Sequence, residues 1–104
     1  MIRAVFYKSK EIYSGFEISG HAGYAEKGSD IVCASVSSAV QFAINLLAEF
    51  GCKPLAEAQD NGTVRCEAGL CEENASRIIN QLMLHLKSIL EEFPQTIKIT
   101  ISEV

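Results

Sequence analysis

The stretch from Ile31 to Phe50 constrains the fold of this chain more than any other, because it is long, largely apolar and amphipathic. Its apolar side chains recur every three or four residues, which predicts a helix that ends at Gly51. The predicted apolar side of this helix consists of Val36, Ala39, Val40, Ala43, Leu47 and Phe50. On the opposite side Glu49 is the single charge, and the other residues there are polar but uncharged: Ser38, Gln41 and Asn45. Such a side is either exposed to water or covered by another element or subunit, and composition does not distinguish the two.

Six further elements accompany this helix in the sequence. Alternating apolar and polar residues predict five strands, and Asn61-Gly62 between two of them predicts a hairpin. Apolar residues at helical spacing, followed by Pro94, predict a second helix. The predicted elements in order are strands 1–8 and 12–19, helix 31–50, strands 53–57 and 63–67, helix 72–91 and strand 96–102. The order ββαββαβ predicts an α+β fold in which two helices pack on a mostly antiparallel sheet.

Length and composition predict one domain over residues 1–104. Apolar residues make up 48% of the chain, which is enough to build a core without a metal or a disulfide. The net charge of −4 and the lack of a basic stripe argue against direct binding of nucleic acid. The same charge suits a basic protein as partner.

Two features of the sequence bear on the cellular location: the pattern of its first ten residues and the composition of its longest apolar stretch. Residues 1–10 alternate as a strand does and lack the pattern of a signal peptide. Polar residues interrupt the stretch from Ile31 to Phe50, which argues against a membrane span. We therefore expect a cytoplasmic protein with no membrane partner.

Four cysteines are distributed along the chain without a C-x-x-C pair. The spacing favours neither a structural zinc site nor a disulfide framework in a reducing compartment. Cys52, Cys66 and Cys71 are therefore interpreted as small hydrophobic residues, and neither a metal nor a cofactor is expected.

The fourth cysteine, Cys33, belongs to a segment with a different character. His21 stands where the second predicted strand ends, and a loop with several glycines leads to Ser29 and Asp30, which are typical N-cap residues. Cys33 is expected in the first turn of the helix, where unpaired N–H groups and the positive end of the helix dipole favour a thiolate. A base and an activated sulfur in one short segment indicate a cysteine nucleophile.

The same segment, GHAGYAEKGSDIVCASVSS from Gly20 to Ser38, resembles the signature of the ribosomal-processing cysteine protease family (Prp), a family of small bacterial proteins. The His-Ala, Asp, Val-Cys-Ala and Ser elements occur in order around one loop, and the rest of the chain matches in length and element order. The resemblance implies a dyad in which Cys33 attacks the scissile carbonyl and His21 protonates the leaving amine. Backbone N–H groups near Cys33 would then stabilise the oxyanion.

Other residues of the segment are expected to support this chemistry. Asp30 matches the family aspartate and would cap the helix or orient His21, and its position favours capping. Ser37 matches the family serine one turn after Cys33, and is expected to pack tightly or to bond back to the preceding turn. The loop glycines are expected to let substrate binding complete the site. They are Gly20, Gly23 and Gly28.

The resemblance also implies a substrate. Family members remove an N-terminal extension from the precursor of large-subunit ribosomal protein twenty-seven, cut after an aromatic residue, and are dimeric. Two other functions stay open on the residues alone. The chain could be a non-enzymatic ribosome-associated assembly module, or a thiol redox protein in which Cys52, Cys66 or Cys71 resolves an oxidised Cys33.

Overall fold

The computed structural model describes the backbone of residues 1–20 and 29–104, and the side chains of residues 1–20 and 31–104. Each predicted element is present, and the order ββαββαβ is confirmed. The elements are strands β1 (Ile2–Ser9) and β2 (Ile12–Ser19), helix α1 (Ser29–Glu49), strands β3 (Leu55–Ala58) and β4 (Val64–Glu67), helix α2 (Glu72–Glu92) and strand β5 (Ile97–Glu103).

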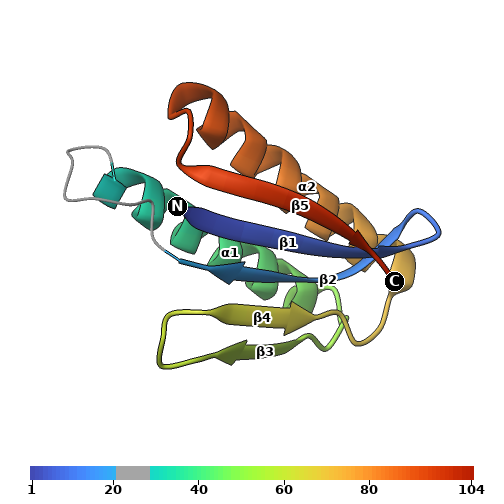
Figure 1. Cartoon of the computed structure of the whole chain (residues 1–104). Coiled ribbons are helices and arrows are strands. Elements are labelled where there is room, and N and C mark those ends of the chain that lie inside the picture. Colours follow the sequence, from blue (N-terminus) through green and yellow to red (C-terminus); the bar gives the residue numbers. More distant parts are fainter. Residues whose placement is uncertain (21–28) are drawn as a thin grey trace.

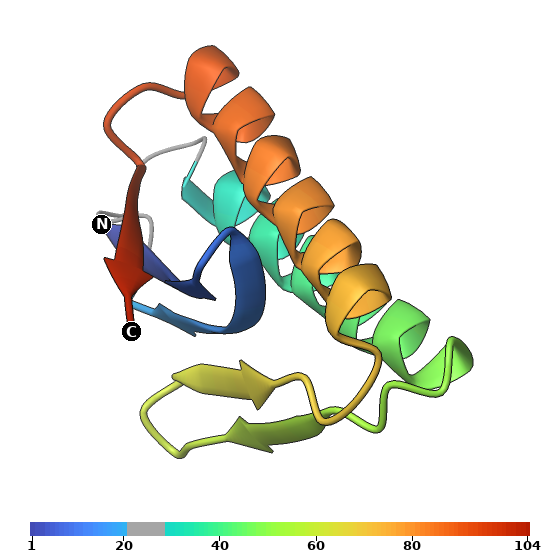
Figure 2. The same cartoon turned by 90° about the vertical axis from the view of Figure 1, so that its right-hand side faces the viewer.

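The five strands form one mixed sheet in the order β3-β4-β2-β1-β5 (Figure 1). Antiparallel pairs join β1 to β2, β2 to β4 and β3 to β4, whereas β1 and β5 run parallel. Both helices lie on the same face of the sheet, as the turned view makes clear (Figure 2). The predicted fold, two helices on a mostly antiparallel sheet, is therefore confirmed.

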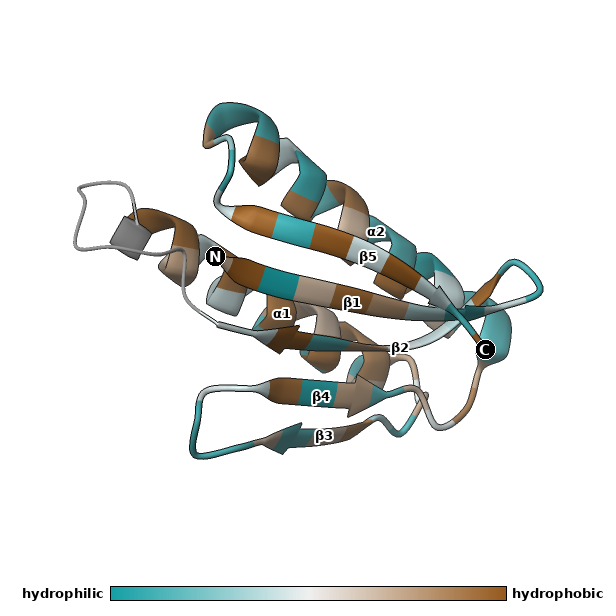
Figure 3. Cartoon of the chain, viewed as in Figure 1, coloured by the Kyte–Doolittle hydropathy of each residue, from teal (hydrophilic) through white to brown (hydrophobic). Residues whose placement is uncertain are grey.

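The core lies between the helices and the covered face of the sheet. Apolar and polar residues alternate along β5 (Figure 3), and buried residues alternate with more exposed ones along the first half of β1. Each of these strands therefore turns one row of side chains toward the helices. Phe6 of β1 and Phe16 of β2 are register partners and fully buried, with ring centroids 6.2 Å apart. The helices add the buried residues Val32, Val36, Val40, Ala43, Leu47, Ala75, Ile79, Leu82, Met83 and Leu86.

The predicted apolar side of α1 is confirmed except at its last residue. Phe50 is 56% exposed, because the helix ends in a tight turn before Phe50 can reach the core. The Gly51 N–H donates to the Ala48 carbonyl at 3.0 Å, and the Cys52 N–H donates to the Leu47 carbonyl at 2.9 Å. This is the Schellman arrangement, with Gly51 at a φ of +74°. The turn brings Cys52 into the core in place of Phe50.

The interpretation of three cysteines as small hydrophobic residues is confirmed for two of them. Cys52 and Cys66 are fully buried in the core. Cys71 is exposed, so the interpretation is wrong there. Cys71 immediately precedes α2 in a left-handed backbone conformation (φ 59°), on the surface where the chain enters the helix.

Buried Cys66 makes stability sensitive to alkaline pH. Burial, and secondarily the charge of Glu67, raises the pKa of the Cys66 thiol from an ordinary 9.0 to about 11. The folded protein therefore holds a proton that the unfolded chain loses near pH 9. The stabilisation is complete below pH 9 and is lost as the pH rises toward 11, by up to about 2–3 kcal/mol.

This loss is measured by urea unfolding at pH 8, 9, 10 and 11, with Cys66→Ala as the comparison. The variant starts from a lower stability because it leaves a small cavity, but its unfolding free energy falls less steeply over this range. Parallel curves for the two proteins would show that Cys66 does not control the alkaline loss.

In the described part of the chain, one helix is long and apolar enough to cross a membrane, over Ile31–Glu49. Core helices of soluble proteins have the same length and composition. The buried side chains of α1 belong to the core that the helix shares with the sheet and α2.

Candidate active site

Cys33 is the fifth residue of α1, partly buried against the core. The helix begins at Ser29, two residues earlier than predicted, so Cys33 lies just beyond the first turn and not inside it. Only the first four N–H groups of a helix lack a partner within it. The expectation that Cys33 lies inside the first turn is therefore corrected.

A cleft of about 630 Å³ runs along α1 and has Cys33 in its wall. On α1 the lining residues lie three or four positions apart, and so share one side of the helix. They are Cys33, Val36, Ser37, Val40, Gln41 and Ile44. The β3–β4 hairpin supplies the opposite wall with Ala56, Glu57, Ala58, Gly62 and Val64, and the starts or ends of β1 and β2 supply Ile2, Ile18, Ser19 and Gly20.

The cleft exists because the edge strand β3 carries small side chains where the inner strands carry large ones. Ala56 and Ala58 pair with Cys66 and Val64 of β4 and line the cleft across from α1. A methyl group is too short to fill the space that Phe6 and Phe16 fill further into the sheet. The cleft that remains is lined mostly by apolar atoms, and Cys33 lies in its wall. No feature of the sequence analysis anticipated it, although the two alanines of β3 were the available signal.

Two of the residues expected to support the chemistry are placed in this cleft. Ser37 lines it one helical turn after Cys33, as predicted. Gly20, the residue that follows β2, also lines it. His21, Gly23 and Gly28 lie outside the residues that the structure describes. Asp30 lies within the first turn of α1, and its side chain belongs to the part left undescribed. The dyad and the role of Asp30 therefore stay predictions.

Gly20 is required where it stands for two separate reasons. Its φ is +84°, and a Cβ built on it would lie 2.6 Å from the backbone oxygen of Met1. We expect Gly20→Ala to lower the free energy of unfolding by about 2–3 kcal/mol, since strain at positive φ adds to a backbone clash.

The matched control for this prediction is Gly51→Ala. Gly51 has a similar φ of +74° but no atom within 4 Å of the position of a Cβ. It should lose only the conformational part, about 1 kcal/mol. Urea unfolding of both variants separates the two contributions, and equal losses would show that the approach of Met1 is not limiting.

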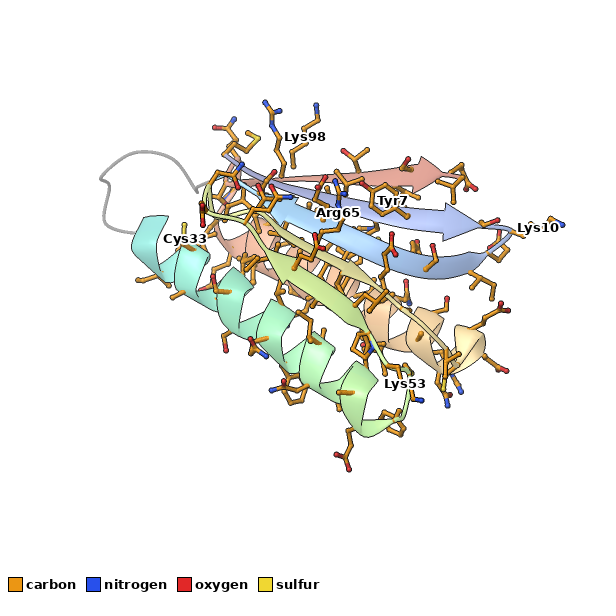
Figure 4. The ribbon with its side chains drawn as sticks, turned by 90° about the horizontal axis from the view of Figure 1, so that it is seen from below. Tyr7, Lys10, Cys33, Lys53, Arg65 and Lys98 are labelled. Carbon is orange, nitrogen blue, oxygen red and sulfur yellow. The ribbon has the colours of Figure 1, made fainter. Side chains whose placement is uncertain are left out.

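The exposed cysteine and its buried neighbour lie far from Cys33. Cys52 follows the last turn of α1, and the Cys71 Sγ lies 3.6 Å from the Phe50 carbonyl oxygen at that same end. Figure 4 shows Cys33 near one end of α1 and Lys53 beyond the other. Because a helix rises 1.5 Å per residue, the two ends are more than about 20 Å apart. Neither Cys52 nor Cys71 can therefore resolve an oxidised Cys33 within one molecule.

A second groove, of about 860 Å³, lies between α1 and α2 on the side away from the sheet. It is larger than the cleft but does not include Cys33 among its lining residues. Its walls include the exposed Phe42, together with Leu46, Ile78 and His85. In the residues that the structure covers, no group of three or more His, Cys, Asp or Glu side chains could hold a metal ion.

A partly exposed cysteine in the wall of a long apolar cleft, near the start of a helix, suits an enzyme with a cysteine nucleophile. Comparison with known proteins gives the particular family. The chain belongs to the ribosomal-processing cysteine proteases, because the family profile "Cysteine protease Prp" matches residues 1–98.

Individual relatives agree with this assignment. The ribosomal processing cysteine protease Prp of Bacillus subtilis (strain 168) is 30% identical over 112 aligned positions, which cover 96% of each chain. The crystal structure of SMU.848 from Streptococcus mutans is similar with a TM-score of 0.86 and 27% identity, over 100% of this chain and 96% of that one.

A third relative has been solved with a peptide. It is the ribosomal processing protease Prp of S. aureus in complex with a covalently linked product peptide. The similarity has a TM-score of 0.83 and 25% identity, and covers 98% of this chain and 100% of that one. Membership of a protease family favours an enzyme over a non-enzymatic assembly module.

Proposed function

We propose that this chain is a cysteine endopeptidase that removes the N-terminal extension of large-subunit ribosomal protein twenty-seven. The observation that carries the proposal is the position of Cys33 in the wall of the apolar cleft between α1 and the β3–β4 hairpin. A covalently linked product peptide in the S. aureus relative supports a covalent mechanism in the family. An apolar cleft suits an aromatic side chain next to the scissile bond, after which the cut is proposed to fall.

In the proposed reaction the Cys33 sulfur attacks the scissile carbonyl carbon, and the carbonyl π electrons move to the oxygen. Backbone N–H groups at the start of α1 stabilise the resulting oxyanion. When the C–N bond breaks, His21 gives its proton to the leaving amine, and a thioester remains on Cys33. Water, deprotonated by His21, then releases the carboxylic acid and restores the thiol. Asp30 and Ser37 support the dyad from the first turns of the helix. The loop glycines give the loop the freedom to complete the site when the substrate binds.

The charge of the chain suits this substrate. The net charge of the chain is −4. Ribosomal proteins are basic in general because they bind RNA phosphates, so a negative enzyme attracts such a precursor over distances near the Debye length. No direct contact with nucleic acid is required. We place the protein in the cytoplasm, where ribosomal proteins are made.

We also propose that the protein is a homodimer, as the family resemblance implies. The groove between α1 and α2 offers a surface for it, since Phe42 is 65% exposed at its wall and Ile31 is 58% exposed on the same helix. Sedimentation analysis of the purified protein measures the mass directly.

The test of the proposed function is to mix the purified protein with the extended precursor and to follow the mass of both products. Loss of one N-terminal fragment that ends in an aromatic residue is expected. A precursor with that aromatic residue replaced by glycine should be cut far more slowly, by about a hundredfold if the side chain contributes some 3 kcal/mol. An intact precursor after prolonged incubation with folded protein would contradict the assignment of substrate.

The width of the cleft gives a separate prediction. Ala58→Phe places a large ring in the cleft opposite α1, and we expect KM for an extended peptide to rise about 10–100-fold as binding is lost. Leu55→Phe on the same strand is the control, because Leu55 is 67% exposed and does not line the cleft. Steady-state kinetics on both variants measure the effect. An unchanged KM in Ala58→Phe would place the peptide elsewhere.

A further inference from the structure

Two short segments connect the β3–β4 hairpin, which forms one wall of the cleft, to the rest of the protein. We call these segments, residues 52–54 and 68–71, the neck, and each contains one cysteine. Cys52 precedes the hairpin and Cys71 follows it. The Leu70 N–H donates to the Cys52 carbonyl at 2.7 Å. A Cβ built on Gly69 would lie 2.5 Å from the Lys53 carbonyl oxygen, so the two backbones of the neck are already as close as glycine allows.

The Cys71 side chain is turned toward the end of α1, where Cys52 lies. The Cys52 side chain is fully buried at the end of α1, where the Schellman turn holds its backbone. Cys71 adopts a left-handed conformation (φ 59°, ψ 52°), which is uncommon for a residue with a Cβ, and its side chain does not cap α2. The Cys71 thiol instead donates to the Phe50 carbonyl oxygen at 3.6 Å, beside Cys52.

The electrostatics of Cys52 agree with this contact. Burial raises the pKa of the Cys52 thiol, and a hydrogen bond with the Cys71 side chain and its charge raise that pKa further. Cys52 is therefore a protonated, protected thiol, and Cys71 is the exposed member of the pair that an oxidant meets first.

We propose that Cys52 and Cys71 form a dithiol that a hydroperoxide oxidises to a disulfide across the neck of the hairpin. The Cys71 sulfur attacks the peroxide O–O bond and becomes a sulfenic acid, with release of water or an alcohol. The Cys52 sulfur then attacks the Cys71 sulfur, the S–O bond breaks, and hydroxide leaves with the Cys52 proton as a second water. Two thiols lose two electrons in total, and the peroxide gains them.

The other two cysteines do not fit this role. Cys66 is fully buried within β4, and its pKa of about 11 keeps it a thiol. Cys33 stands at the opposite end of α1. The proposed disulfide closes a ring around residues 53–70 and fixes the base of the cleft wall. Its formation does not depend on the protease activity, so it can be tested in protein that cuts nothing.

The test is to oxidise the reduced full-length protein with hydrogen peroxide, block remaining thiols with N-ethylmaleimide, and digest it without reductant for mass spectrometry. We expect a mass lower by two hydrogens and one pair of peptides joined through Cys52 and Cys71, separated again by dithiothreitol. Cys71→Ser, a change at the surface, should abolish the joined pair. Cys66→Ala should leave it unchanged.

Other products would overturn the proposal. These are a sulfinic acid on Cys71 with Cys52 still alkylatable after denaturation, a bridge that includes Cys33, or both thiols remaining reduced under peroxide. A second measurement tests the fit of the bond. Closing a ring of this length should raise Tm by on the order of 10 °C over the reduced protein. An unchanged or lower Tm would show that the neck must distort, and that the pair is not prearranged.

Discussion

Replacing Cys33 by alanine is expected to lower kcat/KM for the precursor at least about a thousandfold, because the sulfur proposed to attack the scissile carbonyl is removed. The protein should stay folded, since Cys33 is only partly buried at the edge of the core. Binding of the peptide should also persist, because the rest of the cleft wall is unchanged. A fluorescent extended peptide measures both quantities, by cleavage and by anisotropy.

The matched control is Cys71→Ser, which removes an exposed thiol at the other end of α1 and should leave kcat/KM unchanged. Loss of cleavage with retained binding in Cys33→Ala alone assigns the sulfur to the chemical step. If Cys33→Ala kept more than about a tenth of the activity, a difference of only 1.4 kcal/mol in the barrier, the nucleophile would have to be another group.

Replacing Phe16 by alanine is expected to lower the free energy of unfolding by about 3–5 kcal/mol, a large part of the 5–15 kcal/mol typical of a domain. Phe16 is fully buried at the centre of β2, in contact with Phe6 across the strand pair. Its loss removes the aromatic contact and leaves a cavity in the core. Urea unfolding followed by circular dichroism gives the difference in the midpoint and the slope.

Phe50→Ala makes the same chemical change at an exposed position and serves as the control. Phe50 is 56% exposed beyond the end of α1, so the expected loss is within about 0.5 kcal/mol. A loss as large as that of Phe16→Ala would mean that Phe50 is covered in solution, for example by a second subunit. If both variants lost equally little free energy of unfolding, Phe16 would not lie in the core.

The candidate site was predicted from local sequence in some respects and not in others. Cys33 and Ser37 were named from a short linear motif, and the structure places both in one cleft because they lie one helical turn apart. Gly20 lines the same cleft, but its two constraints were not visible in the sequence. The positive φ and the approach of Met1 depend on how β1 and β2 pair.

Errors in the prediction have the same origin. The helix was expected to begin at Ile31, and it begins at Ser29, which moves Cys33 beyond the first turn. Phe50 was assigned to the apolar side by its spacing, but the turn at Gly51 directs Cys52 inward in its place. Cys71 was interpreted as a small hydrophobic residue, although it is exposed before α2. Helix ends depend on capping bonds between neighbours, which periodicity does not report.

By itself the sequence determined the element order, the two helices and the identity of the cysteine nucleophile candidate. These properties depend on residues within a few positions of one another, whose spacing directly sets which side of a helix or strand they occupy. Only the tertiary structure decided that Ala56 and Ala58 face α1 across an open cleft, and that Cys52 and Cys71 meet at the neck of the hairpin. Both depend on contacts between segments distant in the chain, which form once the sheet and the helices pack together.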